Sequence, residues 1–273
     1  MKVFISADME GTAGVTDWEQ VMAKHPEYAR FRRLMTEEVN AAALGAIEGG
    51  AKEIVVNDSH ADMRNILIEE LHPQVQLISG SPKPYSMMQG IDASFDAVFF
   101  TGYHGIAGTA NAILDHSFSS ASVRQIKLGN LVVGEPGMNA ALAGFFKVPV
   151  ALVTGDGTAV AQVKKLIPQV EAVAVKEAIG RVAARSYQPV EARRRIKDGA
   201  LRALKRVKDL KPFVIPRPVA LEIEWHYTGM ADRCMLIPGV TRVNARAIGF
   251  KAKDAEQAYT VTIACLVMAR STL

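Results

Sequence analysis

Short apolar runs alternate along the first half of the chain with longer segments whose apolar residues recur at helical spacing. Such apolar runs are typical of strands that are buried on both faces of a parallel sheet. The predicted strands are residues 3–5, 53–56, 75–78, 97–100, 148–153 and 170–175. The predicted helices between them are residues 28–48, 64–71 and 158–166. This alternation indicates right-handed crossovers and helices on both faces of the sheet.

The pattern changes near residue 180, beyond which helices and strands no longer alternate regularly. The predicted helices there are residues 177–185, 190–209 and 255–270, and the predicted strands are residues 221–225, 233–236 and 247–250. The run KPFVIPRP at 211–218 predicts an extended connector, because each proline restricts its own backbone and that of its predecessor. We therefore predict an α/β domain over 1–180, with a mostly parallel sheet flanked by helices, and a smaller α+β subdomain over 181–273.

Composition is that of a globular protein, with 273 residues of which 49% are hydrophobic and 7% aromatic. A strand pattern begins at residue 2, so we expect no signal peptide. The most apolar stretch, 139–154, is interrupted by Lys147 and Pro149 and is too short to span a bilayer, so we expect no membrane partner. The two cysteines have no ligand spacing, which favours a reducing compartment. Cytoplasmic location is the prediction.

Basic residues gather in one segment of the chain. Residues 181–211 contain 11 Lys or Arg against 3 Asp or Glu, whereas the whole chain has a net charge of only +4. Apolar residues recur at helical spacing within 189–209, so the basic side chains are expected to form a solvated helix face. No aromatic residue lies within 189–209 to stack on bases, and we expect no nucleic-acid partner.

Acids and imidazoles stand where several predicted strands end. The first strand leads into Asp8 and Glu10 in SADMEG, the second into Asp58 and His60 in VVNDSH, and the fourth into His104 in FFTGYH. Residues i and i+2 of an extended chain point to the same side, so the two acids of the first pair converge. Because ligands bind outside the carboxyl ends of strands in open α/β sheets, these side chains are expected to meet at one edge.

A further acid, Glu135, follows the apolar pair in VVGEPGMN and is expected to join this edge. Carboxylate oxygens and imidazole nitrogens without a thiolate suit zinc, manganese or another borderline cation. One catalytic zinc needs three protein ligands, whereas two metals bridged by a carboxylate use five. Cations would also relieve the repulsion between Asp8 and Glu10. The predicted metal ligands are Asp8, Glu10, His60, His104 and Glu135.

Ordinary structural roles are the alternative for each of these residues. Asp8 could cap a turn, and Asp58 could bond to the backbone that follows it. Repetition at separate strand ends favours the metal site over these alternatives. The other histidines lack such a setting, and we predict structural roles for His25, His72 and His226.

Familiar catalytic motifs are missing from the sequence, which contains no HExxH, GxxxxGK[ST] or GxSxG. GDGTAVA, from Gly155, lacks a third glycine and is typical of a turn with a helix cap. His116 ends the glycine- and alanine-rich segment HGIAGTANAILDH, which could reach over the metal edge.

Seven ordered motifs together resemble those of the D-aminopeptidase family of zinc metallopeptidases, over residues 1–156. They are SADMEG, MTEEVN, VNDSH, LHP, GYH, HS and VGEPGMNA. The resemblance implies that Asp8 bridges two zinc ions, that Glu10 and His60 complete one site, and that His104 and Glu135 complete the other. It also implies a catalytic role for His116 and a ring-like homo-oligomer.

The hypothesis that follows is a dizinc aminopeptidase that hydrolyses short peptides or aminoacyl amides with N-terminal D-amino acids. Two alternatives stay open on the sequence alone. A two-metal phosphoesterase would use the same pair of ions to clamp an in-line displacement. A non-enzymatic binding protein would use the basic helix at 189–209 and would leave the strand-end acids with structural roles.

Overall fold

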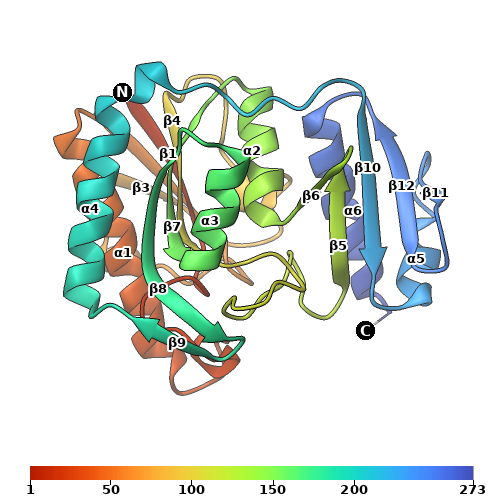
Figure 1. Ribbon diagram of the computed structural model, residues 1–273, viewed down its shortest axis with the longest axis horizontal. Helices are drawn as coiled ribbons and strands as arrows, with labels where there is room; N and C mark the ends of the chain where they lie inside the picture. The colour runs from red at the N-terminus through yellow and green to blue at the C-terminus, as the bar shows by residue number, and fades with distance from the viewer. Residues whose placement is uncertain (273) are drawn as a thin grey trace.

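Two β-sheets separated by helices make up the computed structural model, which describes residues 1–272 (Figure 1). The larger sheet contains β1 (Lys2–Ala7), β2 (Glu53–Asp58), β3 (Val75–Ile78), β4 (Ala97–Tyr103), β7 (Val150–Asp156), β8 (Glu171–Gly180) and β9 (Ala183–Ser186). The smaller sheet contains β5 (Val123–Leu128), β6 (Leu131–Val133), β10 (Val219–Trp225), β11 (Thr241–Arg242) and β12 (Ala247–Ala252). The α-helices are α1 (Tyr28–Glu48), α2 (Glu135–Phe145), α3 (Gly157–Leu166), α4 (Pro189–Lys205), α5 (Thr228–Cys234) and α6 (Ala255–Arg270).

The larger sheet has the strand order β3-β2-β1-β4-β7-β8-β9, and only β9 is antiparallel to its neighbour. This arrangement confirms the mostly parallel sheet of the prediction. In register, Ala7 of β1 lies between Asp58 of β2 and Thr101 of β4. The carboxyl ends of these three strands therefore lie at one edge, where the predicted ligands follow them.

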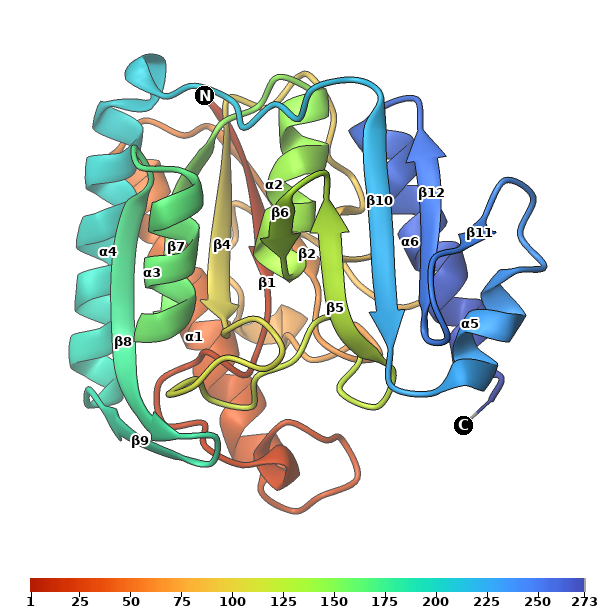
Figure 2. The same cartoon turned by 45° about the vertical axis from the view of Figure 1, so that its right-hand side comes forward.

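Helices cover both faces of this sheet, as the apolar strands require. Helices α1 and α4 pack against each other and cover one face, and α3 packs on β7 and β8 on the other (Figures 1 and 2). Helix α2 lies between the sheets, in contact with β4 on one side and with β6 and α6 on the other. Strands β1, β4 and β7 are buried almost throughout, so the ligand edge rests on a densely packed core.

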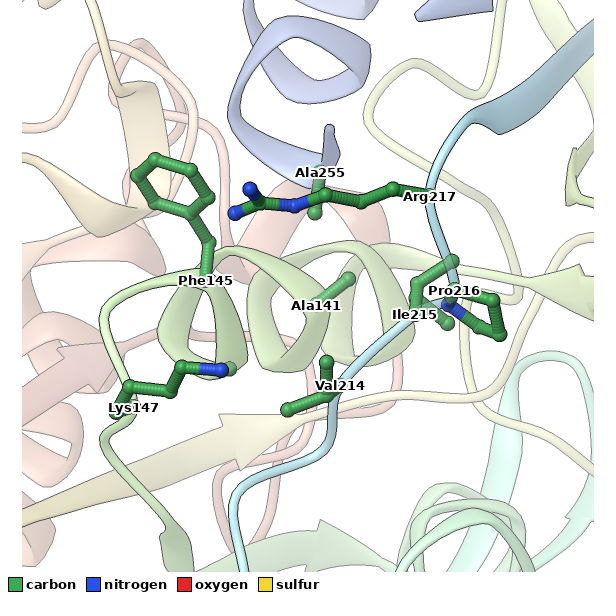
Figure 3. A pocket seen from close by; sticks show the side chains of 9 residues that line it. Ala141, Phe145, Lys147, Val214, Ile215, Pro216, Arg217 and Ala255 are labelled. Carbon is green, nitrogen blue, oxygen red and sulfur yellow. The ribbon is translucent and has the colours of Figure 1, made fainter. Parts of the chain in front are cut away.

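The smaller sheet is antiparallel and has the order β11-β12-β10-β5-β6. The connector 211–218 runs along α2 to reach it, and a side chain at Gly144 would overlap the carbonyl oxygen of Phe213. A pocket of about 450 Å³ lies between α2 and this connector, where Arg217 extends over the ring of Phe145 (Figure 3). This pocket is at the end of α2 remote from Glu135, so it is separate from the predicted metal edge.

Three predicted elements are wrong. Residues 177–185 form the β8–β9 hairpin instead of a helix, because pairing along the sheet outweighs the helix propensity of Glu, Ala and Arg. Residues 233–236 include the last two residues of α5 and the turn that follows it, and they do not form a strand. Residues 64–71 contain only a 3₁₀ turn, Ile68–Glu70. The backbone amides of Asn65 and Ile66, which precede this turn, donate to the Asp58 carboxylate instead of beginning a helix.

The predicted division at residue 180 stays a prediction. Strands β5 and β6 come from the first 180 residues and lie in the smaller sheet, whereas β9 and α4 come from the remainder and pack with the larger one. Within the described residues, none of the helices combines the length and the apolar composition needed to cross a bilayer.

Candidate metal centre

The five predicted ligands lie together at the carboxyl edge of the larger sheet. Asp8 directly follows β1, His104 directly follows β4, and Glu135 is the first residue of α2, while Glu10 and His60 come from the loops after β1 and β2. Each of the five is at most 5% exposed. Carboxylates and imidazoles that are this deeply buried need partners of opposite charge or a cation.

Asp8 lies between two pairs of donors. Its Oδ1 is 3.5 Å from Nδ1 of His60, which is 3.0 Å from Oε2 of Glu10. Its Oδ2 is 3.5 Å from Nε2 of His104, which is 3.1 Å from Oε2 of Glu135. Each oxygen of one carboxylate thus faces a separate histidine–glutamate pair, as a carboxylate that bridges two cations must.

His116 approaches the same centre from the loop that follows β4. Its ring stacks on His104 with 4.0 Å between centroids and 8° between planes. Its Nε2 lies 3.9 Å from Oε1 of Glu10 and 3.7 Å from Oε1 of Glu135. Its Nδ1 lies 2.8 Å from the carbonyl oxygen of Leu114. Because a carbonyl only accepts, the proton is on Nδ1, and Nε2 of the neutral ring faces the centre with its lone pair.

Charges in the centre shift the pKa values of its members. Burial and the charge of Glu10 raise the pKa of Asp8 well above its ordinary value. Burial opposes ionisation of His104, but the charge of Glu135 raises the pKa of that imidazole to about 10. Burial and the neighbouring charge of His104 lower the pKa of His116. The carboxylates therefore attract positive charge, while His116 is the imidazole that stays neutral most readily.

The donors fit a divalent cation. Oδ2 of Asp8 is buried and has no hydrogen-bond partner among the described residues. Ligand atoms of Asp8, Glu10 and His104 lie within 4.8 Å of one another, as do those of His104, His116 and Glu135. An orphaned carboxylate oxygen beside imidazole nitrogens is the oxygen and nitrogen donor set that zinc accepts.

Glycines allow the ligand loop to lie directly on β4. Gly102 has φ +70°, and a side chain there would overlap the carbonyl oxygen of Asp8. The amide of Asp8 donates to Thr101 O at 2.8 Å, and the amide of Gly11 donates to Gly102 O at 2.8 Å. The backbone after β1 is therefore fixed to β4, and the side chains of Asp8 and His104 start from fixed positions.

Lys176 of β8 binds the backbone of this loop, and the sequence analysis did not identify it as a site residue. It is fully buried, and its Nζ donates to the carbonyl oxygens of Glu10 at 2.5 Å, Thr12 at 2.9 Å and Val15 at 2.6 Å. A lysine inside the apolar run VEAVAVKEA was the signal available. Burial lowers the pKa of Lys176 to about 7.

The remaining strand-end acid and the other histidines do not enter the centre. The Asp58 carboxylate accepts from the amides of Asn65 at 2.6 Å and Ile66 at 2.8 Å, so it stabilises the turn after β2. His25 lies 4.0 Å from Glu19. The amide of His226 donates to Ser122, and Nδ1 of His72 accepts from Gln74.

Comparisons with known proteins agree with the motif resemblance. A family model described as D-aminopeptidase matches residues 1–264. D-aminopeptidase from Bacillus subtilis (strain 168) is 37% identical over 273 residues, which is 100% of this chain and 99% of the relative. The solved structure of Zn-dependent D-aminopeptidase DppA from Bacillus subtilis, described as a self-compartmentalizing protease, matches with a TM-score of 0.96 and 37% identity, covering 99% of this chain and 98% of that one. The chain belongs to the D-aminopeptidase family.

Proposed function

We propose that this protein is a zinc-dependent D-aminopeptidase that binds two ions per subunit and hydrolyses short peptides or aminoacyl amides with N-terminal D-amino acids. The observation that carries the proposal is Asp8, whose two oxygens face two separate histidine–glutamate pairs. Glu10 and His60 would hold one ion and His104 and Glu135 the other, with Asp8 shared. Two bound cations supply Lewis acidity, which polarises a carbonyl group and acidifies water.

His116 is the proposed proton carrier. Its neutral ring directs an unprotonated Nε2 at the centre, while Leu114 O fixes its tautomer through Nδ1. In this geometry, Nε2 accepts a proton from the attacking water and returns it to the amine that leaves. The lowered pKa of His116 keeps the ring neutral, and therefore able to accept, at neutral pH.

Three buried carboxylates supply the negative charge that two divalent cations would neutralise. The match to D-aminopeptidases, and not this charge, supports cleavage next to the amino terminus. No lysine or arginine of residues 1–272 forms an ion pair with Asp8, Glu10 or Glu135. A phosphoesterase would use the same two ions, so it is the match to D-aminopeptidases, and not the charge of the centre, that argues against this alternative.

Several basic side chains of the helix α4 pair with acidic residues of neighbouring elements. Arg193 of α4 pairs with Glu37 of α1, and Lys197 pairs with Glu48 at 2.6 Å. Arg202 lies 2.8 Å from Glu171 of β8. These pairs direct part of the basic face of α4 toward the sheet and α1, which supports the expectation that this helix has a structural role.

A ring-like homo-oligomer in the cytoplasm is the proposed assembly and location. The Bacillus subtilis relative is described as self-compartmentalizing, and near-complete coverage of both chains at 37% identity supports a similar assembly here. Sedimentation velocity of the purified protein measures the oligomer directly, and a monomer at micromolar concentration would contradict this part of the proposal.

Zinc analysis paired with a substrate panel tests the function. We expect close to two zinc ions per subunit, hydrolysis of D-alanine amide in preference to L-alanine amide, and no hydrolysis of a simple phosphodiester. Asp8→Asn should lower the zinc content below one ion per subunit and abolish turnover, because both ions lose the shared carboxylate. Asp62→Asn, on an exposed residue of the loop after β2, is the matched control and should change neither. Asp8→Asn with two zinc ions and full activity would refute the site.

A further inference from the structure

Arg181 stands at the turn between β8 and β9 (Figure 2). Its side chain binds the loop that contains His116. Its Nε donates to Oδ1 of Asp115 at 2.8 Å, and a terminal nitrogen donates to Asp115 O at 3.3 Å. Its carbonyl oxygen accepts from the amide of Leu114 at 2.9 Å. The hairpin turn thus binds both residues that precede His116, through side chain and main chain.

The same guanidinium group also contacts Trp18, whose ring packs against His116. It lies 5.5 Å from the ring centroid of Trp18, and the Trp18 ring meets the edge of His116 at 5.4 Å and 62°. The His116 ring also stacks on His104, which directly follows β4. His116 therefore contacts one ring that the sheet fixes and one ring that Arg181 contacts.

The loop needs support of this kind because little regular structure holds it. Leu114 has φ +46°, a left-handed conformation that a branched side chain rarely adopts. Leu114 is also the residue whose carbonyl oxygen sets the tautomer and direction of His116. Asp115 uses its second oxygen, Oδ2, to accept from Gly108 N at 2.6 Å, which closes the loop on itself. Its other oxygen, Oδ1, connects the closed loop to Arg181.

We propose that Arg181 is a positioning residue that sets the orientation of His116 through Asp115, Leu114 and Trp18. The inference rests on the proposed function, in which His116 carries the proton. The Arg181 side chain is 50% exposed and its partner Asp115 only 14%. Half-exposed ion pairs of this kind contribute little to global stability, so the effect falls on the geometry of the reaction.

Steady-state kinetics separate positioning from a general structural role. Arg181→Ala should lower kcat about tenfold with KM changed less than about twofold, because Nε2 of His116 loses its alignment while the substrate site stays intact. Arg181→Lys retains a cation over Trp18 and one donor for Asp115, and should recover part of kcat. Arg185→Ala, on an exposed arginine of β9 that forms no ion pair among residues 1–272, is the matched control and should leave kcat unchanged.

Coupling to Asp115 gives a second test. If the two residues act as one connection, Arg181→Ala combined with Asp115→Asn should lose no more kcat than Arg181→Ala alone. Additive losses, an unchanged kcat in Arg181→Ala, or a rise in KM alone would each overturn the proposal.

Tryptophan fluorescence tests the connection without any need for activity. Of the two tryptophans, Trp225 is fully buried, so a change in acrylamide quenching reports on Trp18. Arg181→Ala should increase quenching and Arg185→Ala should not; equal quenching in both would overturn the proposal. If the wild type hydrolyses no aminoacyl amide, the proposed function fails, while this measurement still shows whether Arg181 orders Trp18.

Discussion

The predicted metal ligands and His116 meet at one centre, but the chain fixes them in different ways. Asp8, His104 and Glu135 directly follow a strand or begin a helix, and the backbone beside them is bonded to the sheet. His116 lies in an irregular loop that depends on side chains from elsewhere, namely Arg181 on the hairpin turn and Asp156, which accepts from Ile113 N at 2.9 Å.

This difference assigns two tasks to two kinds of structure. Ion ligands must keep their spacing within a few tenths of an ångström, which regular strands provide. A proton carrier must reach the substrate after the substrate has entered, which a tethered loop permits. His116 is also the most exposed of the six residues, with 11% of its side chain accessible. We therefore expect changes in the loop to affect turnover and changes at the sheet edge to affect ion binding and stability.

His116→Ala should have the largest effect on turnover without an effect on ions. Removing the proton carrier should lower kcat by about 10² to 10⁴, the usual contribution of general acid–base catalysis, while zinc content stays close to that of the wild type. Steady-state kinetics and metal analysis on the same preparation measure both. His72→Ala, outside the centre, is the control. Loss of zinc in His116→Ala would place this residue among the ligands and erase the distinction between edge and loop.

The same contrast decides what could be predicted from the sequence. The strand at the N-terminus and the gathering of acids and imidazoles after β1, β2 and β4 were predictable, because apolar runs and the residues that follow them are adjacent in the chain. Lys176 and Arg181 were not, because their roles depend on contacts with Glu10 and Asp115 that lie 166 and 66 positions away. The hairpin at 177–185 was predicted as a helix for the same reason, since only its pairing in the fold shows it to be strands.

Gly102 at the sheet edge and Gly108 in the loop have similar backbone angles, so substitutions at the two positions compare the edge with the loop. Gly102 at the edge has φ +70° and would place a side chain against Asp8 O, whereas Gly108 in the loop has φ +78° and open space around it. Gly108→Ala should cost about 1 kcal/mol of unfolding free energy, from the backbone angle alone. Gly102→Ala should cost about 3 kcal/mol or more, because the Asp8 backbone must also move.

Urea unfolding of the zinc-free proteins measures this difference, and zinc titration shows whether the ion site moves with it. We expect weaker zinc binding in Gly102→Ala and wild-type zinc binding in Gly108→Ala. Equal loss of unfolding free energy in the two variants would show that the backbone at the edge adjusts to a side chain as easily as the backbone of the loop.

A buried carboxyl group beneath the edge provides the clearest pH signature. Glu38 of α1 accepts from Ala13 N at 2.8 Å, and burial raises its pKa from 4.5 to about 7. The unfolded chain loses this proton first, so between about pH 4.5 and 7 the native state holds more protons and its stability falls as pH rises. Glu38→Gln keeps an acceptor for Ala13 and removes the titration. Its unfolding free energy relative to wild type should therefore rise by about 2 to 3 kcal/mol from pH 4.5 to pH 8, as measured by urea unfolding. Glu37→Gln, on the neighbouring half-exposed residue, should show no such rise. A parallel pH dependence in Glu38→Gln and wild type would mean that folding does not shift the pKa of Glu38.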